Sequence, residues 1–291
     1  MTSPTPNRLR GSLLFIGALL IFSVSDATAK YLSVYFAVPL LAWARYASQL
    51  VFMLTTTARR EGWSIVRTEH PLLMIARGLS QVLTTVFVLF AFRTLPLAET
   101  TAIVFITPLL VALMASPILG EKLRRSTWLA TLGGFAGVLF IARPGGVMEG
   151  IGVALALCSA LCYAIYNILT RKLTATEPPA RQLFYIALIG AVTMSLFLPT
   201  FWTGTVPSLG QGLMILSLGF CGGVGHSLLI RAMHHAPASS LSPLLYIQLI
   251  WSTALGWAVF GHLPDAWSVL GMAIIGVSGL ILVLPRRLLA L

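Results

Sequence analysis

Ten long apolar segments, separated by short polar connections, limit how this chain can fold more than any other feature of its sequence. A helix needs about 20 mainly apolar residues to cross a bilayer, and the segments reach or approach that length. We expect them at 10–32, 36–57, 71–93, 97–119, 126–143, 150–172, 181–202, 210–233, 238–261 and 266–285. The sequence therefore predicts an all-α integral membrane protein with ten transmembrane helices and no separate soluble domain.

The charge content agrees with a membrane protein. Only 9% of the residues are charged, whereas about 25% is usual in soluble domains. The formal net charge of +11 would suit a nucleic-acid partner if the basic residues formed one cluster. They lie instead at the ends of the apolar segments, so we expect the lipid bilayer as the partner and no nucleic acid.

The first apolar segment is expected to remain in the protein as a helix. Arg8 and Arg10 precede it, and 27–29 has the small-x-small form of a signal-peptidase site. Asp26 lies directly before that site and argues against cleavage.

The basic residues also predict the orientation of the helices. With the N-terminus in the cytoplasm, fourteen lysines and arginines lie on the inner side, and only Lys30, Arg93 and Arg143 lie on the outer side. Because membrane proteins keep their positive charges inside, both termini are expected to be cytoplasmic.

Two similar stretches indicate an internal repeat. Pro96 lies in the turn before the fourth segment, and Pro237 lies at the corresponding place before the ninth. Aligning these prolines over 91–121 keeps four identities: Ala91/Ala232, Pro96/Pro237, Ile106/Ile247 and Gly120/Gly261. The predicted topology puts the two turns on opposite sides of the membrane. We therefore expect an inverted repeat of five plus five helices, 1–145 and 146–291, which is common in alternating-access carriers.

Charged side chains inside the bilayer are costly and mark candidate functional positions. Asp26 and Lys30 lie four residues apart on one helix, and Arg45 lies at a comparable depth on the next. We expect a structural clasp, either Asp26–Arg45 or Asp26–Lys30, with a proton-coupling role for Asp26 as the alternative. Glu121, at the cytoplasmic exit of the fourth segment, is expected to act as a clasp at the helix end.

The third segment carries a polar stripe. Arg77, Gln81, Thr84 and Thr85 recur at helical spacing and share one face. Arg77 is expected either to extend to the inner interface or to belong to this polar face. Gln81 lies near the midplane, where a buried amide needs partners, so it is the better candidate for a cavity.

Other segments add polar residues at similar depth. Gln248 and Trp251 share one face of the ninth segment, and Tyr246 lies on nearly the opposite face. We place Gln248 and Trp251 at the site because Gln248 is nearest the midplane. Pro108 removes a helical hydrogen bond in the fourth segment and leaves a carbonyl free. The residues expected to bind substrate are Gln81, Thr101, Phe105, Tyr163, Asn167, His226, Gln248 and Trp251; those expected to gate or brace are Asp26, Lys30, Arg45, Arg77 and Glu121.

Several short motifs carry a family resemblance. They are 119–123 (Leu-Gly-Glu-Lys-Leu), Ala98 after the Pro96 turn, Ala232 with Pro237, and Gly271 with Gly276. In these the chain resembles, over essentially its whole length, a ten-helix bacterial exporter of the drug/metabolite transporter superfamily, EamA type. Within that family it is most similar to the YddG-type amino-acid exporters. One position departs from the pattern, because His262 stands where the family often repeats a glutamate.

The resemblance implies a secondary transporter of the bacterial inner membrane. It would export small metabolites, amino acids foremost, by alternating access around a midplane cavity between the two repeats. A drug or cation efflux carrier of the same fold, or a channel, is the alternative. Lipophilic cations are disfavoured because no acidic residue lies in the middle of the first helix. Gly225-His226-Ser227 lacks the second glycine of a nucleophile elbow, so no enzyme is expected, and neither is any cofactor or metal. Monomer and homodimer both stay open.

Overall fold

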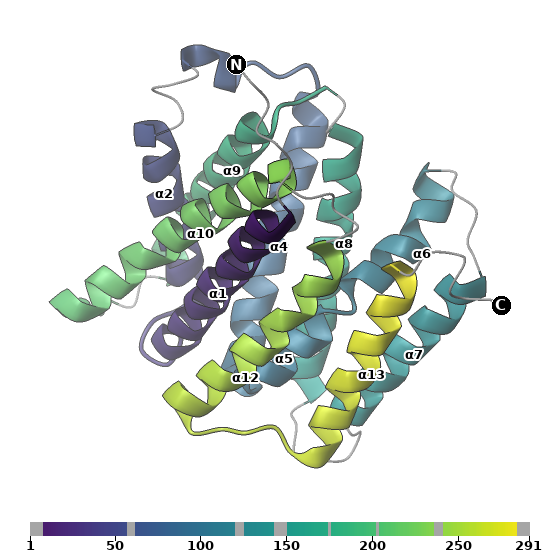
Figure 1. Cartoon of the computed structure of the whole chain (residues 1–291). Helices are drawn as coiled ribbons and strands as arrows, with labels where there is room; N and C mark the ends of the chain where they lie inside the picture. The colour runs from purple at the N-terminus through teal and green to yellow at the C-terminus, as the bar shows by residue number, and fades with distance from the viewer. Residues whose placement is uncertain are drawn as a thin grey trace.

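The computed structural model describes residues 8–56, 62–119, 125–142, 150–173, 176–201, 204–235 and 241–283. Within these ranges the protein is built from helices, without strands (Figure 1). The helices are α1 (Arg8–Leu32), α2 (Val38–Thr56), η1 (Gly62–Val66), α4 (Pro71–Thr94), α5 (Leu97–Val104), α6 (Thr107–Leu119), α7 (Arg125–Ala142), α8 (Gly150–Leu173), α9 (Pro179–Phe201), α10 (Leu209–His235), η2 (Ser242–Tyr246), α12 (Ile247–Phe260) and α13 (Ala266–Val283).

Each expected apolar segment coincides with one helix or with two consecutive helices. Among the described residues, six helical stretches are long and apolar enough to cross a membrane, and three shorter apolar ones accompany them. Together they support an integral membrane protein. The count of ten spans and the cytoplasmic position of both termini stay predictions.

The fourth segment is not one helix, as the sequence analysis expected, but two. α5 ends at Val104 and α6 begins at Thr107, with a turn at 105–106. The cause is Pro108, which has no N–H to donate to the carbonyl of Val104 four residues earlier. The Thr107 hydroxyl donates to that carbonyl instead, at 2.6 Å. The helix can therefore break inside an apolar protein without leaving the freed carbonyl unbonded.

The ninth segment also departs from the single helix predicted for it. Its first described part is the 3-10 helix η2, which contains Pro243, and the α-helix proper begins only at Ile247. Pro237, on which the repeat was aligned, lies outside the described residues.

The helices pair in a pattern that is symmetric between the two halves of the chain. α4 packs along α8, and α1 packs along α10. In the expected repeat, α1 corresponds to α8 and α4 corresponds to α10. Exchanging the two halves therefore turns one of these pairs into the other. The same exchange maps the α2–α9 and α7–α13 pairs onto themselves. Figure 1 shows α7 and α13 on one flank, and α2, α9 and α10 on the other.

Glycines let several of these helices approach closely. A Cβ on Gly271 of α13 would lie 2.5 Å from the carbonyl oxygen of Gly137 on α7. On α10, a Cβ at Gly219 would lie 2.4 Å from the backbone nitrogen of Gln49 on α2. The contact between α7 and α13 is therefore a close packing of helices through small residues.

Candidate functional site

A clasp joins the C-terminal half of α1 to the N-terminal half of α2. Arg45 Nη1 lies 3.8 Å from Asp26 Oδ1. Of the two expected clasps this is the one present, and the Asp26–Lys30 alternative is wrong. Lys30 Nζ instead donates to the backbone oxygens of Phe92 (2.5 Å) and Leu95 (2.6 Å). These carbonyls lie at the C-terminal end of α4, where helices leave acceptors unpaired and favour a cation.

Arg77 joins α4 to α8 and α9. Its side chain is only 2% exposed. The guanidinium donates hydrogen bonds to the Thr170 hydroxyl (2.7 Å), the Gln182 carbonyl (2.9 Å) and the Tyr166 hydroxyl (2.9 Å). It also lies 4.6 Å from the centre of the Tyr166 ring. The expectation that Arg77 extends to the inner interface is therefore wrong, because its partners lie inside the protein.

The aromatic residues of α8 continue from this arginine. The rings of Tyr163 and Tyr166 stack with their centroids 5.6 Å apart. The Asn167 side-chain nitrogen donates to the Tyr163 carbonyl at 2.7 Å, within the same helix. Tyr163 and Asn167 thus lie one turn apart on α8, next to the ring that Arg77 contacts.

Gln81 lies one turn beyond Arg77 on α4. Its backbone carbonyl accepts a hydrogen bond from the Tyr46 hydroxyl at 2.9 Å, and the same hydroxyl lies 2.6 Å from Thr85 Oγ1. The side-chain oxygen of Gln81 is buried, and no described residue donates to it. An unpaired buried acceptor costs about 1–3 kcal/mol, so such an atom marks a place where a donor from a ligand or water can bind.

His226 on α10 is a further polar residue of this region. Both Arg45 and Arg77 lie close enough to act electrostatically on it, and its ring meets the edge of Phe22 at 5.1 Å between centroids. The two arginines, although they belong to different helices, thus both lie within electrostatic range of one histidine.

We call this group of residues the central polar cluster. Asp26 also acts electrostatically on Tyr163, which ties α1 to α8 across the cluster. Its members come from five helices (α1, α2, α4, α8 and α10) and are Asp26, Arg45, Arg77, Gln81, Tyr163 and His226.

The expected residues of the fourth and ninth segments lie apart from one another. Phe105 meets Tyr246, with ring centroids 5.9 Å apart. Tyr246 is the residue that the sequence analysis set aside in favour of Gln248 and Trp251. Trp251 packs in another apolar cluster, together with Phe15, Leu19, Ala232 and Leu241. Phe105 and Trp251 therefore do not share one group of contacts.

Thr101, Glu121 and Trp251, which were also expected at the site, give limited information. The Thr101 hydroxyl donates to the Leu97 carbonyl of its own helix at 2.8 Å, which satisfies it without a ligand. Glu121 lies outside the described residues. The indole nitrogen of Trp251 is buried, and the structure supplies no partner for it in the described ranges.

Some functional candidates escaped the sequence analysis. Tyr46 is 2% exposed and bridges α2 to α4. Glu99, in the first turn of α5, is 1% exposed although it is a carboxylate. An acidic residue followed by a long apolar run is a signal that could have identified Glu99.

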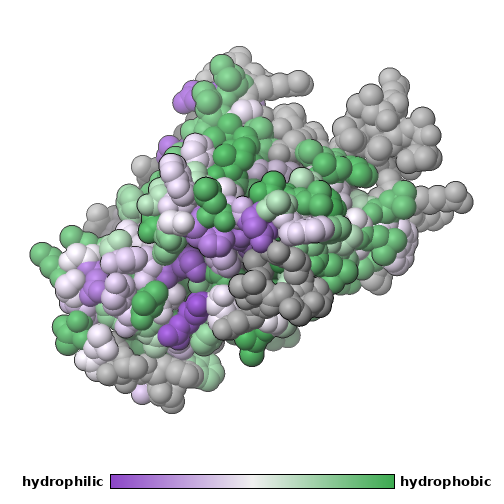
Figure 2. Space-filling view, turned by 90° about the horizontal axis from the view of Figure 1, so that it is seen from below, coloured by the Kyte–Doolittle hydropathy of each residue, from purple (hydrophilic) through white to green (hydrophobic). Residues whose placement is uncertain are grey.

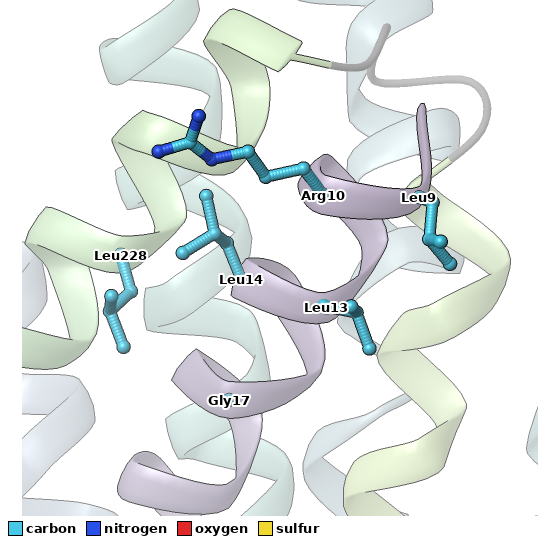
Figure 3. Close-up of a pocket in the computed structure, with 6 residues that line it drawn as sticks. All are labelled: Leu9, Arg10, Leu13, Leu14, Gly17 and Leu228. Carbon is cyan, nitrogen blue, oxygen red and sulfur yellow. The ribbon is translucent and has the colours of Figure 1, made fainter. Parts of the chain in front are cut away.

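A separate pocket of about 410 Å³ lies between α1 and α10. Its walls are Leu9, Arg10, Leu13, Leu14, Gly17 and Leu228, and Figure 3 shows Arg10 extending from α1 towards α10 above Leu14. None of the expected substrate-binding residues lines it. The pocket therefore does not belong to the central polar cluster.

Known proteins resemble this chain over nearly its full length. The pseudopaline exporter CntI of Pseudomonas aeruginosa is 26% identical over 92% of this chain and 94% of its own. The S-adenosylmethionine uptake transporter of Rickettsia prowazekii is 23% identical over 96% and 94%. The riboflavin transporter of Vibrio cholerae is 26% identical over 93% and 91%.

A solved protein structure confirms the fold alone. It aligns with a TM-score of 0.68 and 22% identity, covering 98% of this chain and 100% of that one. The family model described as the EamA-like transporter family matches residues 9–143 and again residues 150–284. Because these two matches take in most of the sequence, the chain belongs to the EamA-like transporter family, within the drug/metabolite transporter superfamily.

Proposed function

We propose that this protein carries small zwitterionic metabolites, amino acids foremost, across the bacterial inner membrane. The relatives are named for pseudopaline, S-adenosylmethionine and riboflavin, all of them small metabolites. Their names include export and uptake, so the direction proposed here, export, rests on the motifs that the sequence analysis identified.

The central polar cluster is the observation that carries this proposal. It contains one acid, Asp26, with Arg45 beside it, and a histidine on which both Arg45 and Arg77 act electrostatically. The 3.8 Å separation of Arg45 and Asp26 is longer than a hydrogen bond. A ligand carboxylate can therefore bind Arg45, and a ligand ammonium can bind Asp26, without breaking a hydrogen bond between these two side chains. A neutral solute would leave both charges unused.

Neighbouring residues would fix the rest of the ligand. Gln81 presents a buried acceptor that lacks a donor within the described structure. Tyr163 offers an aromatic face already aligned by stacking on Tyr166. Arg77 holds three hydrogen bonds of its own, so we assign it a bracing role.

Alternating access would move one half of the chain against the other. The two family matches and the symmetric helix pairs support a division into five plus five helices, 1–145 and 146–291. The interruption between α5 and α6, and the change from η2 to α12, supply points at which helices can bend. The central polar cluster draws on helices of both halves, which alternating access requires.

Counterflow in liposomes tests the proposal. Liposomes that contain the purified protein are loaded with unlabelled amino acids and screened for uptake of labelled ones, with and without a pH gradient. We expect saturable exchange for at least one zwitterion, and Arg45→Gln should raise its half-saturation concentration at least tenfold. The same variant should leave an amino-acid methyl ester, which lacks the carboxylate, unaffected. Equal effects on both compounds would place the site elsewhere.

A cation efflux carrier is the second candidate, and the same liposomes address it. Asp26 is the acid it would use, but Arg45 already lies beside that acid. Saturable exchange of tetraphenylphosphonium, with none of any zwitterion, would favour the cation carrier.

A further inference from the structure

Glu99 is an unusual residue for its position. It lies in the first turn of α5, at the end of the molecule where α12 connects to α13. Its Oε2 atom is buried, and no described group hydrogen-bonds to it. Figure 2 views this end and shows hydrophilic residues gathered across the middle of the face between apolar flanks. A buried carboxylate at such a place must be paired or protonated.

His262 is a basic side chain close to Glu99. Its Nδ1 lies 3.9 Å from Glu99 Oε1, and 44% of its side chain is exposed. The backbone fixes this position, because Gly261 adopts a left-handed φ of 66°. The Gly261 N–H donates to Trp257 and the His262 N–H to Gly256. His262 therefore faces water on one side and the buried carboxylate on the other.

The remaining charged groups at this end have other roles. Lys30 of α1 acts on Glu99 electrostatically, but its ammonium binds two carbonyls of α4 and lies 5.5 Å from the Phe260 ring centre. Asp265 also acts on Glu99, and its carboxylate caps α13 by accepting the Ser268 N–H at 2.8 Å. Arg93, at the end of α4, is exposed. The described parts of α7, α8 and α13 add no charged side chain near this end.

A proton is therefore the natural partner of this carboxyl group. If His262 is protonated, its charge neutralises the carboxylate of Glu99. If His262 is neutral, the carboxyl must hold the proton itself or become hydrated. The atoms lie about 1 Å beyond hydrogen-bond distance, so a small approach of the two helices or one water is enough for transfer.

We propose that Glu99 and His262 form a proton-binding site that links proton uptake from the outer side to the separation of α5 from α12. A proton from water adds to the imidazole and gives imidazolium, which passes its N–H proton to Glu99 Oε1. The products are neutral imidazole and a neutral carboxylic acid. α5 belongs to the first half of the chain and α12 to the second. Proton occupancy thus biases the opening of the outer mouth, and this part of the inference rests on the alternating access proposed above.

Spin labels can measure this opening without a known substrate. Cys158, Cys162 and Cys221 are replaced by serine, and cysteines are placed at the exposed positions Arg93 and Leu263 for labelling. We expect the distance distribution between the labels to change with pH in a single transition. Glu99→Gln, which keeps the shape and removes the titration, should abolish the transition. His262→Gln should shift its midpoint by about one pH unit or more.

Asp265→Asn is the matched control, because it removes a nearby charge and leaves the pair intact. It should keep the transition. An unchanged transition in Glu99→Gln, or no pH dependence in the parent protein, would overturn the proposal.

A transport measurement separates the two proposals. In liposomes, Glu99→Gln should keep counterflow of a labelled amino acid and lose its accumulation driven by a pH gradient. Accumulation equal to that of the parent protein would overturn the proton site. A spin-label transition without counterflow of any amino acid would reject the proposed cargo and leave the proton site standing.

Discussion

Two helix contacts, α4 with α8 and α7 with α13, are among the most extensive in the molecule, yet they differ in chemistry. The α4–α8 contact is polar. Arg77 bonds to Tyr166 and Thr170 across it, and the Ser159 hydroxyl donates to the Thr84 carbonyl at 3.0 Å. The α7–α13 contact is built on the close approach of Gly137 and Gly271.

The polar α4–α8 contact is suited to binding a ligand, whereas the glycine contact between α7 and α13 is suited to holding two helices rigidly together. Hydrogen bonds between side chains can exchange partners when a ligand arrives, and the central polar cluster lies beside such bonds. Backbones that meet at glycines have no side chains that could rearrange, so that contact is expected to move as one body. We therefore expect the α7–α13 pair to brace the movement and the α4–α8 pair to respond to the ligand.

Replacing Arg77 breaks the polar contact and should have the largest effect. Arg77→Met leaves three former acceptors without their buried donor. It should lower the free energy of unfolding in detergent by about 3 kcal/mol. Arg93→Met changes an exposed arginine of the same helix and should cost at most about 0.5 kcal/mol. Similar losses in both variants would refute the bracing role.

Filling the glycine contact should have the next largest effect. In Gly271→Ala the new methyl meets the Gly137 carbonyl oxygen at 2.5 Å, which forces the helices apart. We expect a loss of about 2 kcal/mol in denaturant unfolding. Gly276→Ala on the same helix is the control, since its methyl would find nothing closer than 3.9 Å. If both glycines tolerate alanine equally, the contact is not close-packed.

The connection between α8 and α9, next to the polar contact, gives a pH-dependent test. Glu177, buried between α8 and α9, accepts hydrogen bonds from the Thr68 hydroxyl, the Glu69 N–H (3.0 Å) and Arg181 (2.7 Å). Burial alone would raise its pKa, but these bonds outweigh burial and hold the pKa below the usual 4.5. Because its pKa is lower in the folded protein than in the unfolded chain, the ionised carboxylate of Glu177 stabilises the fold at pH values above the pKa of the unfolded state. This stabilisation is lost as the pH falls through the pKa of the folded state.

Glu177→Gln should therefore cost about 1.5 kcal/mol at pH 7. The difference from the parent protein should shrink steadily below pH 4.5, as followed by unfolding in detergent across a pH series. Glu69→Gln, whose side chain is exposed, should show neither effect. A cost that does not change with pH would show that packing, and not charge, explains the loss.

Replacing Gln81 should change stability least while it changes transport. Its side-chain oxygen has no partner among the described residues, so Gln81→Leu breaks no hydrogen bond of that oxygen and should not lower the free energy of unfolding. Transport affinity for the exchanged amino acid should fall about tenfold, the value of one lost hydrogen bond. Thr84→Val is the control, because its hydroxyl bonds back to Ser80 of its own helix. Unchanged affinity in Gln81→Leu would remove α4 from the binding site.

The positions of the helices could be predicted because apolar length depends on the sequence alone. Even so, the break after Val104 was missed, since a proline in a helix can bend it or end it. The outcome depended on Thr107, whose hydroxyl takes over the freed carbonyl. The fate of Lys30 also needed the structure. Its partner proved to be the end of a distant helix rather than the acid one turn away.

At the candidate site, too, part of the arrangement was predicted from the sequence and part needed the structure. Asp26 was expected to pair with either Arg45 or Lys30, and the structure shows the pair with Arg45. Tyr246 and Trp251 were ranked by depth and helical face, yet their neighbours depend on how α12 is rotated against α5 and α1. Helical periodicity predicts which residues share a face but not which helix that face meets.

By itself, the sequence determined a helical membrane protein, because the scarcity of charge and the recurring apolar lengths favour helices that cross a bilayer. The EamA type followed from the resemblance of its short motifs and from the family match. Tertiary structure alone decided which polar groups meet. It turned Arg77 onto α8 and α9, brought two arginines within electrostatic range of His226, and buried Glu99 beside His262. The physical reason is that hydrogen bonds and charges act over a few ångströms, and only the packing of distant helices sets such distances.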